Sequence, residues 1–395
     1  MKSNKKKGIP SAVIALGFVS LLTDLSSEMI YPLLPVFLTS VLGAGAFAIG
    51  LIEGVAEMTA SVLKIISGYI TDRTGKRKSM VLAGYTLSSL MRPLIGIAAV
   101  WPQVLFFRFM DRVGKGVRTS PRDALIGDVT DRSIIGRAYG FHRAMDHAGA
   151  VIGPLVAVFL LKGMGLSLKT IFLLSIVPGL FVILIILFFV RERTEVPEGS
   201  GSLIAEDGEP RSGVRDFGRQ YWLFIVSVFI FALGNSTDAF ILLRLNIEGV
   251  GASTIAILWS GFHVVKMGST WMGGRLSDRI GRKPMILSGW LYYALIYVLF
   301  ALLRGEMALV SVFLLYGVSF GFIEPAERAW VFRLVPKELR GRAFGFYHGA
   351  VGVASLPASV IFGLIWQRWG YGCAFMTGAF LSVAAVAVLS GVKEK

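Results

Sequence analysis

Acidic and basic side chains stand inside some of the most apolar stretches of this sequence. Asp24 and Glu28 are four residues apart in the first such stretch and therefore share one helix face, as do Arg108 and Arg112 in the fourth. At 1.5 Å of rise per residue, Asp24 lies about 18–20 Å from the start of the first stretch, and Glu28 lies one turn further along. Arg108 and Arg112 reach about the same two depths, measured from the same side of the membrane. Two neighbouring carboxylates avoid each other unless one is protonated or paired. We therefore expect these four residues to bind protons and substrate, with Glu28 facing Arg108 and Asp24 facing Arg112.

Further polar side chains on other apolar stretches are candidates to line the same cavity. Each is either a cavity residue or one partner in a structural pair between helices. These candidates are Glu53, Glu57, His142, Asp146, Asn235, Asp238, His263 and Lys266.

A metal site at His142 and Asp146 is a further hypothesis, because imidazole and carboxylate ligands suit transition metals. We predict none, since His142 falls near a helix end and Tyr347 replaces it where the segment repeats. The sequence has no zinc motif, nucleotide-binding loop or Ser/His/Asp arrangement, so we expect neither a cofactor nor enzymatic activity.

The composition is that of a chain embedded in lipid. Of the 395 residues, 54% are hydrophobic and only 16% are charged, against about 25% in soluble domains. Apolar stretches long enough to cross a bilayer must be helical, because hydrocarbon cannot satisfy a bare backbone. We predict an all-α membrane protein with twelve spans: 11–41, 45–70, 79–99, 102–120, 138–161, 169–190, 220–246, 252–274, 284–303, 307–331, 342–367 and 370–391.

The net charge of +15 follows the loops rather than one surface. Lys and Arg gather at the N-terminus and in every second loop, which predicts that both termini are cytoplasmic and that the chain sits in a bacterial plasma membrane. The charge is therefore explained by topology, and we expect no nucleic-acid partner. The single cysteine, Cys373, excludes an internal disulfide. The basic and apolar start runs on past Glu28 with no cleavage signal, so we interpret it as an uncleaved first helix.

The chain divides into two related halves. Residues 1–190 and 220–395 flank a polar segment rich in Gly, Pro and Ser at 191–219, which we interpret as a cytoplasmic linker. GYITDRTGKRKSMVL at 68–82 returns as GRLSDRIGRKPMIL at 274–287, and GRAYGFH at 136–142 returns as GRAFGFY at 341–347. The offsets are 206 and 205 residues. Two repeats at nearly one offset predict parallel six-helix halves around a central cavity.

On these loops the sequence resembles the major facilitator superfamily. The motif residues are Gly68, Asp72, Arg73 and Gly75 in the first half and Gly274, Asp278, Arg279 and Gly281 in the second. The resemblance implies that this loop latches the two halves together on the cytoplasmic side. Its Asp would lie at the N-terminus of a neighbouring helix, where the helix dipole favours a negative charge.

The fifth span is similar to a motif of the proton-coupled antiporters in that superfamily. It carries Gly140, Gly149, Gly153 and Pro154, and departs from the motif at Ala157 and Val158. The end of the fourth helix matches the superfamily less well, because Lys115 and Arg118 stand where the family has uncharged residues. Small residues at such spacings form a smooth face for helix packing.

The resemblance implies a secondary active transporter that exports small organic compounds in exchange for protons, by alternating access. We expect a monomer whose partners are the substrate, protons and the lipid bilayer. The alternatives are an exporter of metal ions or metal chelates, a proton-coupled importer of a metabolite and, in another class, a non-transporting membrane receptor.

Overall fold

The computed structural model describes residues 8–74, 76–131, 134–190, 217–335 and 340–393. Every regular element within these ranges is a helix, as predicted for the fold class. The α-helices are α1 (Ser11–Glu28), α2 (Leu34–Val36), α3 (Ala46–Thr74), α4 (Arg77–Leu94), α5 (Trp101–Asp128), α6 (Ile135–Val158), α7 (Leu168–Leu174), α8 (Ile176–Phe189), α9 (Arg219–Gly234), α10 (Ala239–Ile247), α11 (Ala252–Ile280), α12 (Arg282–Leu302), α13 (Glu306–Leu334) and α14 (Arg340–Ser390). Short 3-10 or π segments follow at η1 (Tyr31–Leu33), η2 (Phe37–Val41), η3 (Ile95–Ile97) and η5 (Phe159–Gly163).

Nine stretches of the described chain are long and apolar enough to cross a membrane. The stretch Ala343–Ser390 is one of these nine, although the backbone of Gly370 leaves helical geometry within it (φ 87°). The long helices α5 and α11 are not among the nine, and both carry several charged side chains. The count of twelve spans therefore stays a prediction.

The first helix of each half is interrupted at an equivalent place. The α-helix ends at Glu28 in the first half and at Gly234 in the second, inside the spans predicted over 11–41 and 220–246. Both stretches are still long and apolar enough to cross a membrane, as Ser11–Val41 and Arg219–Ile247, so the break lies inside each predicted span. In the first half, Pro32 and Pro35 follow the break and lack the N–H groups that a continuous helix needs. Irregular backbone is tolerated inside a membrane where it lines a cavity.

One helix is longer than the apolar pattern indicated. The fourth span was expected to end at residue 120, yet α5 continues to Asp128 with Pro121 inside it. Hydropathy marks where a chain leaves the lipid, whereas a helix continues for as long as its hydrogen bonds and packing hold. The polar last turns of α5 place Arg122 on a helix instead of in a loop.

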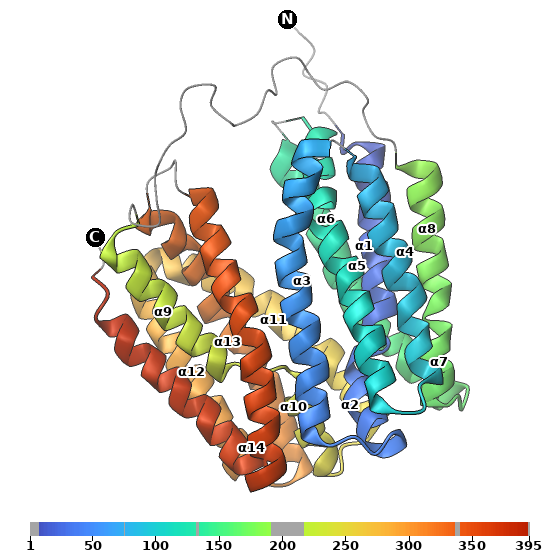
Figure 1. Cartoon of the computed structure of the whole chain (residues 1–395). Helices are drawn as coiled ribbons and strands as arrows, with labels where there is room; N and C mark the ends of the chain where they lie inside the picture. The colour runs from blue at the N-terminus through green and yellow to red at the C-terminus, as the bar shows by residue number, and fades with distance from the viewer. Residues whose placement is uncertain (1–7, 75, 132–133, 191–216, 336–339, 394–395) are drawn as a thin grey trace, which may run out of the picture.

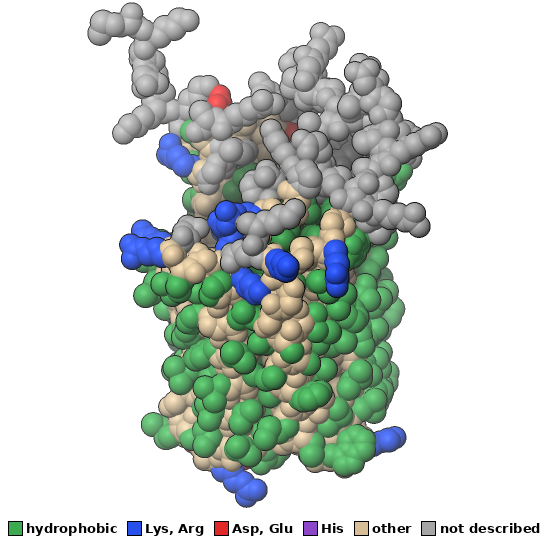
Figure 2. Space-filling view, turned by 90° about the vertical axis from the view of Figure 1, so that its left-hand side faces the viewer, with side chains coloured by type: hydrophobic (Ala, Val, Ile, Leu, Met, Phe, Trp, Pro, Cys, Tyr) green, Lys and Arg blue, Asp and Glu red, His purple; other side chains and the backbone are tan. Residues whose placement is uncertain are grey.

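The helices form two bundles that lean together (Figure 1). One bundle holds α1 to α8 and the other α9 to α14. Helices α1 and α9 begin, and α14 finishes, at the same end of the molecule. We call this end the terminal end and the opposite one the far end. Figure 2 shows a mostly hydrophobic surface with few charged side chains below the Lys and Arg that gather near the terminal end. Large apolar side chains such as Phe188, Trp271 and Phe380 are more than 60% exposed, as expected of surface that faces lipid.

The bundles contact each other toward the far end, where α3 packs on α14. A Cβ atom added at Gly363 would lie 2.7 Å from the carbonyl oxygen of Ala46. Deeper in the bundle, a Cβ atom at Gly54 would lie 3.1 Å from Leu356. Small residues of this kind let helices approach closely. Toward the terminal end the ribbons of the two bundles diverge (Figure 1).

A polar clamp holds the far end of the second bundle. The guanidinium of Arg244, fully buried, donates to the carboxylate of Glu248 (2.6 Å) and to the carbonyl of Leu303 (2.8 Å). Glu248 follows the last turn of α10 and also accepts the backbone N–H of Gly305 (2.7 Å). The hydrogen bond from Gly305 and then that from Arg244 lower the pKa of the Glu248 carboxyl below its ordinary value of 4.5.

Candidate functional site

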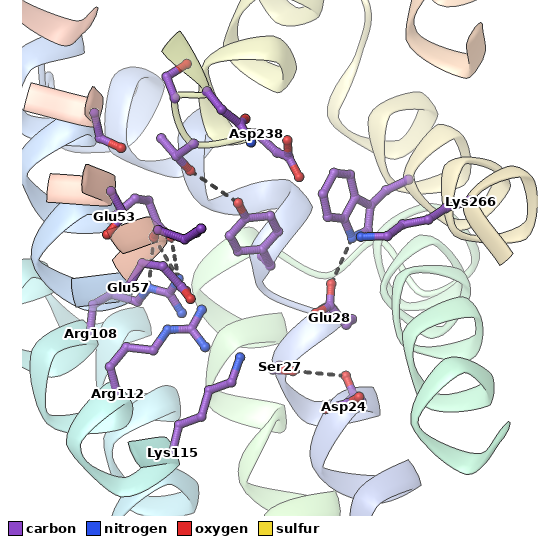
Figure 3. A pocket seen from close by; sticks show the side chains of 18 of the residues that line it. Asp24, Ser27, Glu28, Glu53, Glu57, Arg108, Arg112, Lys115, Asp238 and Lys266 are labelled. Carbon is purple, nitrogen blue, oxygen red and sulfur yellow. Dashed lines mark hydrogen bonds and ion pairs between the residues drawn. The ribbon is translucent and has the colours of Figure 1, made fainter. Parts of the chain in front are cut away.

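A central pocket lies between the two bundles, with a cavity volume of about 480 Å³. Side chains from α1, α3 and α5 form one wall, and residues of the α9–α10 break, α11 and α13 form the other (Figure 3). The charged lining residues are Asp24, Glu28, Glu53, Glu57, Arg92, Arg108, Arg112, Lys115, Arg118, Asp238 and Lys266. The four residues predicted to act together, Asp24, Glu28, Arg108 and Arg112, thus line one cavity.

Within that cavity the predicted pairing of Arg108 is wrong. Its guanidinium binds Glu53 of α3, with Nη2 at 2.7 Å from both carboxylate oxygens and Nε at 3.0 Å from one. Both side chains are nearly buried, at 4% and 5% exposed. Arg108 also lies 3.6 Å from Asp111, which is bound in turn by Arg92 of α4 (2.9 Å). The predicted residues share one cavity, but the partner of Arg108 lies on α3 and not on α1.

Glu28 instead bonds across the boundary between the bundles. Its carboxylate accepts the indole N–H of Trp259 on α11 at 2.8 Å. The ring of Trp259 lies against that of Tyr31 (5.1 Å between centroids). The hydroxyl of Tyr31 is in turn 3.4 Å from that of Thr237, in the break between α9 and α10. This chain of contacts joins the end of α1 to the second bundle.

Asp24 has no ion pair within 4.0 Å among the residues that the structure describes. The predicted pair with Arg112 is therefore wrong as well. Figure 3 places Lys115, on the next turn of α5 after Arg112, with its side chain reaching into the pocket toward α1. A buried nitrogen, the Nε of Arg112, has no hydrogen-bond partner in the described structure. In the part of the chain that the structure describes, Arg112 and Lys115 line the cavity with no carboxylate within 4.0 Å.

Two basic residues that the motif comparison treated as departures belong to this wall. Lys115 and Arg118 both line the pocket, and Arg118 is only 4% exposed. Arg118 donates to the hydroxyl of Ser88 (2.8 Å) and lies over the ring of Tyr85 (4.4 Å). The spacing of Arg108, Arg112, Lys115 and Arg118 along one helix was the signal for a basic face. All four residues lie inside the predicted span 102–120, but Lys115 and Arg118 were treated only as departures from the family motif.

The second bundle contributes three of the predicted cavity residues, each already bonded. Asn235 accepts the hydroxyl of Tyr293 (3.0 Å), and Asp238 accepts that of Tyr316 (2.7 Å). Lys266 is 3.4 Å from the carboxylate of Glu324 and lies over the ring of Phe320 at 3.7 Å. Aromatic rings, which a sequence pattern does not assign to a pocket, therefore form much of this wall.

Three predicted cavity residues do not line this pocket: His142, Asp146 and His263. His142 and Asp146 lie at the contact of α6 with α1, where Asp146 forms a short hydrogen bond with Ser20. His263 packs its ring against Trp259 (5.1 Å). The described residues contain no group of three or more His, Cys, Asp or Glu placed to hold a metal ion.

The small residues of α6 pack directly on the helix that carries the acids. A Cβ atom at Gly149 would lie 3.0 Å from that of Asp24, and one at Gly153 would lie 3.0 Å from that of Glu28. A Cβ atom added at Gly140 would meet no described atom of another segment within 4 Å, so Gly140 has no such role in this conformation. Pro154 lies inside α6 without ending it. Two of the motif glycines, Gly149 and Gly153, therefore lie in the contact between α1 and α6.

Most of the predicted cytoplasmic latch lies outside the described residues or side chains: Asp72, Arg73, Gly75, Gly274 and Asp278. Among its other members, Gly68 lies close to α5: a Cβ atom added there would be 3.4 Å from the side chain of Ser120. Arg279 is exposed in the last turn of α11, and Gly281 ends that helix with a positive φ of 97°. A glycine meets that backbone requirement without strain.

Two helical bundles around a polar cavity, with an apolar outer surface, define a membrane transporter of the two-half type. The sequence model of the Major Facilitator Superfamily matches residues 16–356 and 249–394. A relative in Methanocaldococcus jannaschii, described as an uncharacterised MFS-type transporter, is 35% identical over 90% of this chain and 88% of its own length. The chain belongs to the Major Facilitator Superfamily, and the family predicted from its loops is confirmed.

Other similar proteins agree with this family. The multidrug resistance efflux pump PmrA of Streptococcus pneumoniae is 26% identical over 91% of this chain and 90% of its own length. The solved structure of the nucleoside transporter NupG aligns with a TM-score of 0.80 at 14% identity, covering 97% of this chain and 100% of NupG. A D-xylose–proton symporter aligns with a TM-score of 0.74 at 16% identity, covering 97% of this chain and 98% of its own. These structural likenesses show the shared fold.

Proposed function

We propose that this protein is a proton-coupled exporter of small organic compounds that works by alternating access. The observation that carries the proposal is the bond from Trp259 to Glu28, because it connects an acid of the central pocket to the opposite bundle. The name of the S. pneumoniae relative, a multidrug efflux pump, supports export of organic compounds. We further propose that both termini are cytoplasmic in a bacterial plasma membrane, so that the terminal end faces the cytoplasm.

Coupling would follow from the chemistry of this bond. An ionised carboxylate accepts a hydrogen bond about twice as strongly as a neutral group does. The ionised form of Glu28 therefore favours the conformation described here, in which the bundles are joined toward the far end. Protonation of Glu28 weakens the bond and favours separation at that end. A group that prefers different protonation states in two conformations couples proton binding to the conformational change.

Asp24 lies one turn from Glu28 and faces Lys115 across the cavity (Figure 3). We propose that its proton and the bound compound influence each other through this basic wall. Because α6 packs on α1 at Gly149 and Gly153, a shift at either acid would be passed to α6. The motif similar to that of the antiporters would thus keep α1 and α6 moving together.

A deletion strain and a complemented strain, grown across a panel of toxic organic compounds and metal salts, test the proposal. Complementation should raise tolerance to one or more organic compounds, and Glu28→Gln should remove that gain. The matched control is Glu306→Gln, at an acid in the first turn of α13 away from the pocket. Protection against metal salts alone would favour the metal-exporting alternative. Greater sensitivity on complementation would favour import, which the similarity in fold to a D-xylose–proton symporter keeps as the second candidate.

A further inference from the structure

A carboxyl group lies buried in the second bundle, away from the central pocket. Glu327 of α13 is 4% exposed and is not among the residues that line the cavity. Two other residues of the same helix, Tyr316 and Phe320, do line it. Glu327 stands about two turns beyond Phe320 toward the terminal end. The sequence analysis did not select Glu327, although it falls inside the predicted span 307–331.

Glu327 is held by two hydrogen-bond donors from two other helices. The indole N–H of Trp290 on α12 donates to Oε1 at 3.0 Å, and the hydroxyl of Tyr347 on α14 donates to Oε2 at 2.6 Å. Trp290 is fully buried and Tyr347 is 7% exposed. The carboxyl group therefore joins α12, α13 and α14 inside the bundle.

Among the described residues, no Lys, Arg or His lies within 4.0 Å of this carboxyl group. The contrast with Glu324, one turn earlier on the same helix, is direct. Glu324 is 35% exposed and lies 3.4 Å from Lys266 and 3.9 Å from Arg328. The other charged or titratable groups near Glu327 are Arg328 on its own helix and, on α14, Tyr347 and its neighbour His348.

The internal repeat shows that this position is polar in both halves but opposite in charge. At the offset of 205 residues found from the repeated segments, Glu327 corresponds to Arg122, Tyr347 to His142 and Trp290 to Tyr85. In the first bundle the corresponding residue, Arg122, is a cation. There the cation has an acid, Asp123, at 2.8 Å. The acid of the second bundle has no such counterion among the described residues.

We propose that Glu327 is a proton-binding site of this protein, separate from the central pocket and occupied by a proton in the conformation described here. A buried carboxylate without a cation loses its hydration and gains no ion pair. The neutral acid can instead accept the N–H of Trp290 at Oε1 and donate its own proton from Oε2 to the hydroxyl oxygen of Tyr347. Release of the proton would place a charge among α12, α13 and α14. It therefore requires those helices to separate or water to enter. The site stands independently of the coupling proposed for Asp24 and Glu28.

Infrared spectroscopy of the purified protein in lipid nanodiscs tests this assignment. At pH 7 the wild type should show the C=O absorption of a protonated carboxylic acid in an apolar setting. Glu327→Gln should remove one such band, of the amplitude of one acid per protein. Glu324→Gln is the matched control and should leave that band in place, because its carboxyl group is ion-paired and therefore a carboxylate.

Thermal unfolding gives a second, independent readout. Gln resembles a protonated Glu in shape, and its amide can accept from Trp290 and donate to Tyr347. Glu327→Gln should therefore unfold at a temperature equal to or higher than the wild type at pH 8. If that variant does not fold, Tyr347→Phe keeps the test open, since removing one hydrogen-bond partner of the acid should shift the acid band without abolishing it. An unchanged acid band in Glu327→Gln, or no shift in Tyr347→Phe, would overturn the proposal.

Discussion

The buried ion pair between Arg108 and Glu53 makes a quantitative prediction about stability. Replacing Arg108 with Gln leaves the Glu53 carboxylate 5% exposed and without its partner, while Asp111 keeps its contact with Arg92. Breaking a buried pair by removing one partner costs about 3–5 kcal/mol, because the remaining charge is uncompensated. We expect a loss near the lower end, about 3 kcal/mol, since Glu53 lines the pocket, where water can reach its carboxylate.

The double variant Arg108→Gln/Glu53→Gln should recover much of that loss, because it leaves no unpaired charge. The assay is equilibrium unfolding in detergent micelles for both single variants, the double variant and a control, Arg328→Gln. Arg328 is 53% exposed and lies 3.9 Å from Glu324, so its loss should cost less than about 1 kcal/mol. Purely additive effects of the two single substitutions would refute the reasoning, as would a loss at Arg108 no larger than that of the control.

Three further predictions concern packing, pH and topology. Gly149→Ala should lower the midpoint of thermal unfolding, because the added methyl group crowds α1 at a cost of about 1–3 kcal/mol. Gly140→Ala, whose methyl group would enter open space, should be neutral, and equal effects of the two variants would contradict the packing described. Because the pKa of Glu248 is lowered in the fold, its contribution to stability is present above the ordinary value of 4.5 and is lost as the pH falls through the lowered value. Glu248→Gln should therefore flatten the acid side of a stability–pH profile, and an unchanged profile would contradict this. In a Cys373→Ser background, an impermeant maleimide added to intact cells should label Met307→Cys near the far end and not Arg279→Cys near the terminal end; the reverse pattern would refute cytoplasmic termini.

The fold class and the family could be predicted from the sequence because both depend on patterns along the chain. Long apolar stretches require helices in lipid, and the repeated loop around Asp72 and Asp278 is a local motif. The breaks after Glu28 and Gly234 were missed because hydropathy does not record where a backbone leaves helical geometry. The prolines at 32 and 35 were the available signal in the first half.

The members of the site were easier to predict than their partners. Asp24, Glu28, Arg108 and Arg112 do line one cavity, since depth along a helix follows from residue number. The partner of Arg108 depends instead on the rotation of α5 and on which helix lies beside it, and neither is written in one sequence. Trp259 was missed for a related reason: an aromatic ring in an apolar helix gives no sign that its N–H group meets a carboxylate from the other half.

The most direct test of the proposed coupling is proton movement in proteoliposomes that contain the purified protein and a compound identified by the growth panel. Adding the compound on one side should drive protons the opposite way in the wild type, which an internal pH-sensitive dye reports. Asp24→Asn and Glu28→Gln should each abolish this proton movement in folded protein, whereas Ser26→Ala, on the same helix but bonded to Ser175, should retain it. Wild-type proton flux in both acid variants, or compound transport by the wild type without proton movement, would contradict proton-coupled export through the first helix.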